Sequence, residues 1–86
     1  MELVIFLHME EIDCLGRDVP ANSTVRSLLM RALQLRHAAG ASGRNAAIFC
    51  DEHGGHELLD YARTKCPECV EKIERAFLIA ELHTPA

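Results

Sequence analysis

The sequence predicts an α+β fold: a small two- or three-stranded sheet packed on one helix, followed by a zinc-stapled C-terminal module ending in a helix. Three observations predict it, namely a β-branched and aromatic apolar run, a helical repeat of apolar residues, and two pairs of metal-ligand type. The 86 residues suffice for a single domain. We expect residues 1–45 to form a scaffold and residues 46–86 the zinc module.

Residues 2–9 are rich in β-branched and aromatic side chains and predict a strand that is buried on both faces, in the middle of a sheet. Ile12 and Cys14 alternate with Asp13, which predicts a short second strand that ends at Gly16. Cys14 itself is expected to be a small core residue because it has no partner pair.

Capping residues at 22–24 precede apolar residues at the spacing of one helix face, so we expect a helix from Thr24 to Ala39. Gly40 then supplies the left-handed residue that ends it. Residues 45–50 predict a third strand. The apolar repeat consists of Val25, Leu28, Leu29, Ala32 and Leu33.

The C-terminal part contains one ambiguous segment and one clear helix. Residues 57–65 fit either a short helix or a tight hairpin, and propensity favours the helix. Pro67 suits the first turn of a helix because its missing N–H would be unpaired there. We therefore expect a last helix from the Cys66 region to about Leu82.

Two pairs with zinc-ligand spacing carry most of the information. Cys50 and His53 form the first pair and, after a gap of twelve residues, Cys66 and Cys69 form the second. These residues predict one Zn²⁺ per chain, and four protein ligands leave no coordination position for a substrate, so the metal is expected to be structural. His56 is a rival for His53 as the fourth ligand.

The two pairs resemble treble-clef zinc modules, in which a knuckle and the first turn of a helix each give two ligands. The resemblance covers residues 48–82 and implies a hairpin between the pairs. The N-terminal half contains a second resemblance. Its strand-to-helix run, residues 18–29, resembles ubiquitin-like β-grasp domains, which implies a binding scaffold.

Other interpretations of the ligand residues remain open. The four residues could be coincidental. The Cys66–Cys69 motif could belong to a thiol oxidoreductase, because a helix start lowers the pKa of a thiol. A catalytic zinc site with His53, His56 and Glu57 is another alternative, but it leaves the Cys-Pro-Glu-Cys pair unexplained.

The charge distribution argues against a general polyanion binder. The net charge is −4, and only residues 23–49, with four arginines and no acid, form a basic segment. Nucleic acid is therefore an unlikely partner, although a zinc-finger regulator that binds it through these arginines is an alternative. They are Arg26, Arg31, Arg36 and Arg44.

The terminal helix suggests the partner. Its apolar residues exceed what one core face needs, so we expect a non-enzymatic protein–protein interaction module or regulator of a larger cytosolic machine. The partner is another protein or a second copy of the chain. The longest apolar run, residues 3–7, predicts neither a signal peptide nor a membrane span, hence the cytoplasm. The candidate contact residues are Phe77, Leu78, Ile79 and Leu82.

Overall fold

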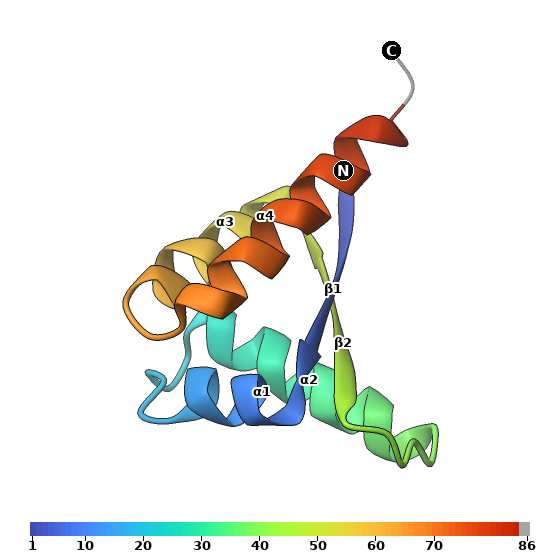
Figure 1. The fold of residues 1–86 in the computed structure, drawn as a ribbon. Helices are drawn as coiled ribbons and strands as arrows, with labels where there is room; N and C mark the ends of the chain where they lie inside the picture. The colour runs from blue at the N-terminus through green and yellow to red at the C-terminus, as the bar shows by residue number, and fades with distance from the viewer. Residues whose placement is uncertain (85–86) are drawn as a thin grey trace.

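The computed structural model describes residues 1–84, and in them a two-stranded antiparallel sheet is combined with four helices (Figure 1). The α+β class predicted from the sequence is confirmed. Among the helices, α3 packs most extensively against α4, and α2 packs more against α3 than against α1. In chain order the elements are β1 (Glu2–His8), α1 (Met9–Gly16), α2 (Thr24–Ala38), β2 (Asn45–Asp51), α3 (Glu52–Arg63) and α4 (Pro67–Leu82).

The two strands pair along their whole length, with Ile5 opposite Ile48 at the centre. Side chains on β1 alternate strictly between buried and exposed. The expectation that this strand is buried on both faces is therefore wrong, because helices cover only one face of the sheet. Val4 and Phe6 lie on the other face, where they are 42% and 65% exposed.

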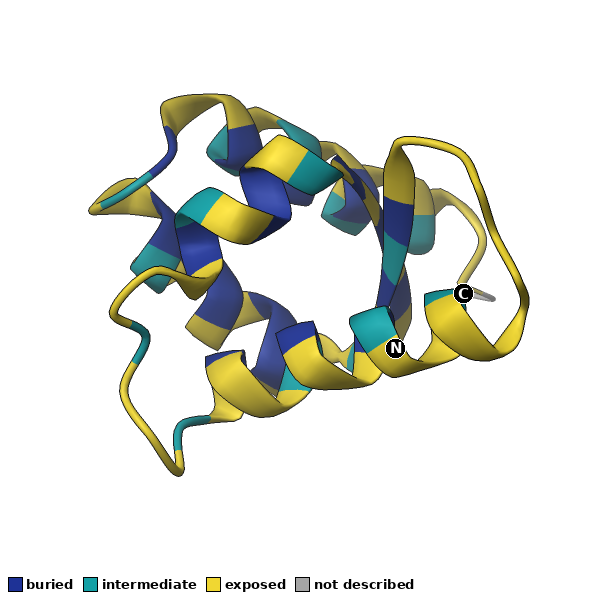
Figure 2. Cartoon of the chain, turned by 90° about the horizontal axis from the view of Figure 1, so that it is seen from below, coloured by how far each residue is buried: buried dark blue, intermediate teal, exposed yellow. Residues whose placement is uncertain are grey.

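The core lies between the covered face of the sheet and the inward faces of the helices (Figure 2). Burial of apolar surface there is the main stabilising contribution to the fold. No helix within residues 1–84 has the length and apolar composition needed to cross a bilayer. The largest fully buried side chains are Leu3, Ile5, Leu7, Ile12, Leu15, Ile48, Leu58, Ile73 and Cys69.

Helix α1 replaces the short second strand expected at residues 12–14. The Glu11 carboxylate accepts a hydrogen bond from the backbone N–H of His8 at 2.8 Å, which supplies a partner for a donor at the start of the helix. Ile12 and Leu15, three positions apart, then both face the core. A strand would have placed these two apolar residues on opposite faces, so helical periodicity prevails over the local alternation.

Helix α2 and strand β2 confirm the helix and the third strand that the sequence predicts. Helix α2 begins at Thr24, where the Ser23 hydroxyl accepts a hydrogen bond from the N–H of Arg26. It ends before Gly40, which has the positive φ of 66° expected of a helix-ending glycine. Strand β2 follows at the residues predicted for the third strand.

The segment between the two predicted ligand pairs is helix α3, and not a hairpin. It begins directly after β2, with the Asp51 carboxylate accepting a hydrogen bond from the N–H of Gly54 at 2.7 Å. Gly54 and Gly55 are thus buried helical residues. The chain then turns into α4, which spans Pro67–Leu82 as predicted.

Candidate functional site

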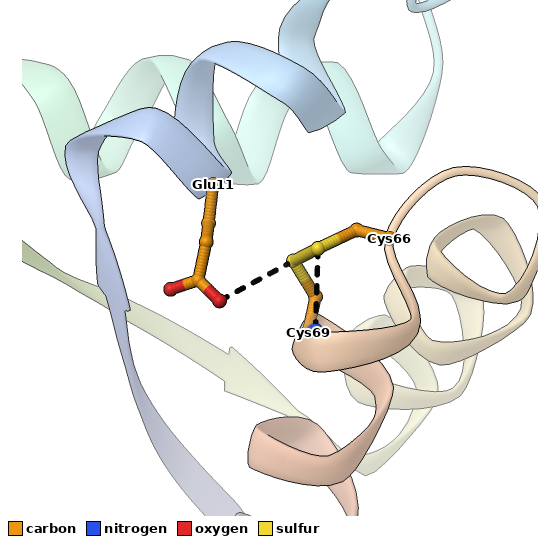
Figure 3. A group of neighbouring side chains, drawn as sticks. All are labelled: Glu11, Cys66 and Cys69. Atoms are coloured by element: carbon orange, nitrogen blue, oxygen red, sulfur yellow. Dashed lines mark hydrogen bonds between the residues drawn. A yellow bond between two sulfur atoms is a disulfide. The ribbon is translucent and has the colours of Figure 1, made fainter.

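Cys66 and Cys69 form a disulfide at the start of α4, and the fold surrounds it (Figure 3). Cys66 is the residue that precedes the helix, and its sulfur accepts a hydrogen bond from the N–H of Cys69 at 3.2 Å. Pro67 occupies the first turn, where its lack of an N–H does no harm. Cys66 is 7% exposed and Cys69 is fully buried, so the pair lies within the core.

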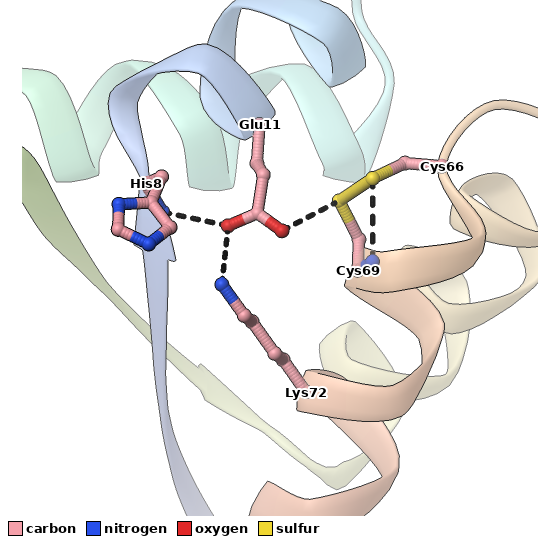
Figure 4. Close-up of polar contacts among 5 residues, drawn as sticks. All are labelled: His8, Glu11, Cys66, Cys69 and Lys72. Atoms are coloured by element: carbon pink, nitrogen blue, oxygen red, sulfur yellow. Dashed lines mark hydrogen bonds and ion pairs between the residues drawn. A yellow bond between two sulfur atoms is a disulfide. The ribbon is translucent and has the colours of Figure 1, made fainter.

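A carboxylate from a distant part of the chain lies next to the two sulfurs. Glu11 projects from α1 and is only 7% exposed, which is unusual for an acid. Its Oε1 atom accepts hydrogen bonds from the His8 N–H at 2.8 Å and from Lys72 Nζ at 2.7 Å (Figure 4). Its Oε2 atom lies 3.9 Å from Cys69 Sγ. One oxygen is thus held by donors while the other faces the sulfurs.

The surroundings keep Glu11 ionised. Burial raises the pKa of its carboxyl, but the hydrogen bonds from Lys72 and the His8 backbone and the positive charge of Lys72 outweigh burial and lower the pKa overall. The site therefore contains a buried carboxylate with one ammonium partner.

The structure does not bring the four predicted zinc ligands together. Within residues 1–84, the one group of three or more ligand-type side chains whose ligand atoms lie within 4.8 Å of one another is Glu11, Cys66 and Cys69. Cys50 lies on β2 opposite Leu3, outside this group.

Both candidate histidines lie on α3 and face solvent. The His53 side chain is 77% exposed, and its Nε2 atom lies 3.7 Å from Glu57. His56 is 58% exposed, lies 3.9 Å from Glu52, and stacks against the Phe77 ring with centroids 4.7 Å apart. Because the segment is helical, the treble-clef resemblance does not extend to the elements between the two pairs.

Sequence reasoning missed Glu11. It lies more than fifty positions from the cysteines, so no spacing rule connects them. One local signal existed, because an acid three residues after the end of a strand is typical of a capping interaction at a helix start. That signal would have predicted helix α1, but not the contact with α4.

The two remaining cysteines are unpaired. Cys50 is half-buried, and burial together with the negative charges of Asp51 and Glu2 raises the pKa of its thiol to about 11. Cys14 packs at the edge of the core, as expected, with its thiol donating a hydrogen bond to the carbonyl of Lys65 at 3.6 Å. Cys50 is therefore kept as a neutral thiol at physiological pH.

A second candidate site is the uncovered face of the sheet, which we term the open face: Val4, Phe6, Ala47 and Phe49. Val4 is paired directly with Phe49, and Phe6 with Ala47, so the four side chains are contiguous. Phe6 and Phe49 are 65% and 48% exposed.

Two shallow grooves flank the open face. One runs between Phe6 and Ile79 of α4, and the other between Phe49 and Leu35 of α2. Their apolar residues extend the open face on both sides, and Lys72 and Arg75 also line the first groove.

The predicted contact residues on α4 divide between two environments. Leu78 and Leu82 are 61% and 83% exposed, and Ile79 is half-exposed beside the open face. Phe77 packs against the core. Helix α4 thus exposes apolar side chains, and the sheet contributes a second apolar surface that the sequence prediction did not include.

Comparison of the chain with protein-family models, curated proteins and solved structures finds no match.

Proposed function

We propose that this protein is a non-enzymatic protein–protein interaction module and that its open face binds a second copy of the chain. The observation that carries the proposal is the uncovered apolar face of the two-stranded sheet. A sheet normally buries one face and leaves the other polar. Here both faces are apolar at their centre, although helices cover only one of them.

Contact with another protein would remove this surface from water. Each Å² of apolar surface removed contributes about 25 cal/mol, and large contiguous apolar patches on soluble proteins commonly mark interaction sites. Phe6 and Phe49 are aromatic, and aromatic residues are enriched at the buried centre of such contacts. The open face therefore has the composition expected of an interface.

The charges at the two ends of the sheet favour a second copy as the partner. Glu2 pairs with Asp51 at one end, where two acids lie directly opposite each other. At the other end, beside Asn45, lies the guanidinium of Arg36, which donates hydrogen bonds to the Asn45 and Gly43 carbonyls. A two-fold axis in the plane of the interface and perpendicular to the strands would place the acidic end of each copy over the Arg36 end of the other.

A contact of standard size would cover a small part of the molecular surface. A typical stable interface buries about 800 Å² on each partner, which is roughly a seventh of the 5713 Å² surface of this chain. The open face with its two flanking grooves, bounded by Leu35 and Ile79, is a continuous surface on which such a contact can form.

The test is the molecular mass in solution, measured by light scattering and sedimentation over a range of protein concentrations. We expect a dimer that dissociates on dilution, and a monomer for the double substitution Phe6→Ser and Phe49→Ser. Both positions are exposed, so circular dichroism should show an unchanged fold. The matched control is Leu78→Ser with Leu82→Ser, which should leave the dimer intact.

Two results would contradict the proposal. One is a wild-type protein that stays monomeric at the highest concentration tested. The other is a dimer that survives the Phe6 and Phe49 substitutions but is lost when Leu78 and Leu82 are changed, which would assign the contact to the terminal helix.

A further inference from the structure

We propose that, when the Cys66–Cys69 disulfide is reduced, Glu11, Cys66 and Cys69 bind one thiophilic divalent cation such as Zn²⁺. This site differs from the one that the sequence predicts, because it contains two sulfurs and a carboxylate oxygen in place of three sulfurs and an imidazole. It is also independent of the open face and of the proposed self-association.

The two sulfurs are placed as metal-binding thiolates require. Both belong to the start of α4, where the positive end of the helix dipole favours ionised thiols. The N–H of Cys69 already points at Cys66 Sγ at 3.2 Å, and such a bond stabilises negative charge on sulfur. Neither side chain needs to move far to share one ion, because each ligand atom lies within 4.8 Å of the others.

Glu11 has the orientation of a supported metal ligand. The carboxylates that bind metals are usually held by hydrogen bonds from a surrounding shell of residues. Here the His8 N–H and the Lys72 ammonium both hold Oε1, which leaves Oε2 directed at the sulfurs, 3.9 Å from Cys69 Sγ.

The charges balance when the ion is present. Two thiolates and one carboxylate give −3, the divalent cation brings the sum to −1, and the ammonium of Lys72 beside Glu11 brings it to zero. Neutrality matters because Cys69 is fully buried and Glu11 nearly so, and an uncompensated charge would be costly there. Three protein ligands leave one position of a tetrahedral zinc for water.

Binding depends on the oxidation state of the pair. In the disulfide the sulfurs are bonded to each other and carry no thiolate charge. Reduction to two thiols needs two electrons and two protons. Two thiol molecules supply them and become a disulfide, or one phosphine and a water molecule supply them and yield the phosphine oxide. Zinc binding then displaces the two thiol protons.

The first experiment uses the full chain reduced with a phosphine and titrated with ZnCl₂, with bound metal measured by competition against a chromogenic chelator. We expect one zinc per chain, and no tight binding by the oxidised protein. The double substitution Cys66→Ser and Cys69→Ser should abolish binding, and Glu11→Gln should weaken it at least about tenfold. The control with Cys50→Ser and His53→Ala should bind zinc like the wild type.

The second experiment needs no variant, so it does not depend on whether the substituted chains fold. X-ray absorption at the zinc edge counts the sulfur atoms around the metal. Two sulfurs with lighter ligands agree with the proposal, whereas three sulfurs would overturn it in favour of the site with Cys50. Failure of the reduced chain to bind zinc would also overturn it and leave the pair as a structural disulfide.

Discussion

Two pairs of residues with the same spacing behave differently in this molecule. Cys66 and Cys69 lie on either side of the first turn of α4, so their sulfurs meet inside the core. Cys50 and His53 lie on either side of the junction between β2 and α3, so the thiol is half-buried beside the sheet while the imidazole faces solvent. Spacing alone therefore does not define a metal site, because the local backbone decides where the two side chains point.

The charged residues near the two pairs also differ. Cys69 has a carboxylate 3.9 Å away that is itself held by an ammonium, which makes a neutral buried pair. Cys50 has two acids near it, and burial together with their charges keeps its thiol protonated. The Cys66–Cys69 pair thus lies beside a carboxylate with its own cation, whereas Cys50 lies beside two acids.

The largest expected effect comes from breaking the buried ion pair beside Cys69. Lys72→Met leaves the nearly buried Glu11 carboxylate without its cation and should lower the free energy of unfolding by about 3 kcal/mol at neutral pH. Urea denaturation of the wild type and of Lys72→Met measures this difference in the free energy of unfolding. Arg63→Met is the matched control, because Arg63 and Asp60 lie 2.8 Å apart, close to the 2.7 Å of Lys72 and Glu11, but are exposed. Its effect should be under about 1 kcal/mol.

The same pair predicts a pH dependence. The pKa of Glu11 is lowered in the folded chain, so its contribution is fully present above the usual value of 4.5 and is lost as the pH falls through the lowered value. The stability difference between the wild type and Lys72→Met should therefore shrink below pH 4.5. A difference that stays constant down to acid unfolding would contradict an electrostatic origin.

A smaller effect is expected at the glycines after His53. A Cβ atom on Gly55 would lie 2.5 Å from Leu3 Cδ1 and 2.8 Å from Phe77 Cζ, so Gly55→Ala should lower the free energy of unfolding by about 1–3 kcal/mol. Gly54→Ala meets its nearest atoms at 3.2 Å and should cost less.

Thermal denaturation of the two glycine variants separates a helix from a zinc knuckle. In a knuckle, the glycine directly after the ligand would adopt a positive φ and Gly54 would be the sensitive position. Greater damage at Gly54 than at Gly55 would therefore indicate that residues 50–55 form a knuckle after all.

The smallest effect concerns the reactivity of Cys50. Because the pKa of its thiol is raised to about 11, alkylation of Cys50 by iodoacetamide should stay slow at neutral pH and accelerate only in strongly alkaline solution. Glu2→Gln removes one of the responsible charges and should increase the rate modestly at a fixed pH. Mass spectrometry of the Cys50 peptide follows the reaction, and fast labelling at neutral pH would contradict the expected environment.

Much of the fold could be predicted from the sequence, because local signals determine most of its elements. The Ser23 cap, the helical repeat after it and Pro67 at a helix start each act within a few residues, and α2 and α4 lie where these signals place them. Helix α1 was predicted as a strand because the apolar alternation at residues 12–14 is too short to distinguish two periodicities. The open face was missed because no local pattern reveals which side of a strand the helices will cover.

The candidate site was only half predictable. The Cys66–Cys69 pair was found from its motif, and the motif also indicates the helix start that positions it. Glu11 could not be found, since its approach to Cys69 is a tertiary contact between side chains of α1 and α4 that are far apart in the sequence. The inclusion of Cys50 and His53 followed from spacing alone, without the helical geometry that directs His53 to solvent.

The most direct test of the contrast between the two pairs is disulfide mapping of the oxidised wild-type chain. Alkylation without reduction, followed by trypsin digestion and mass spectrometry, should show residues 66–72 as one peptide that is lighter by two hydrogens and carries no label. Cys14 and Cys50 should be labelled once the chain is unfolded. A disulfide that joins Cys50 to Cys66 or Cys69 would place the two pairs side by side and contradict the account.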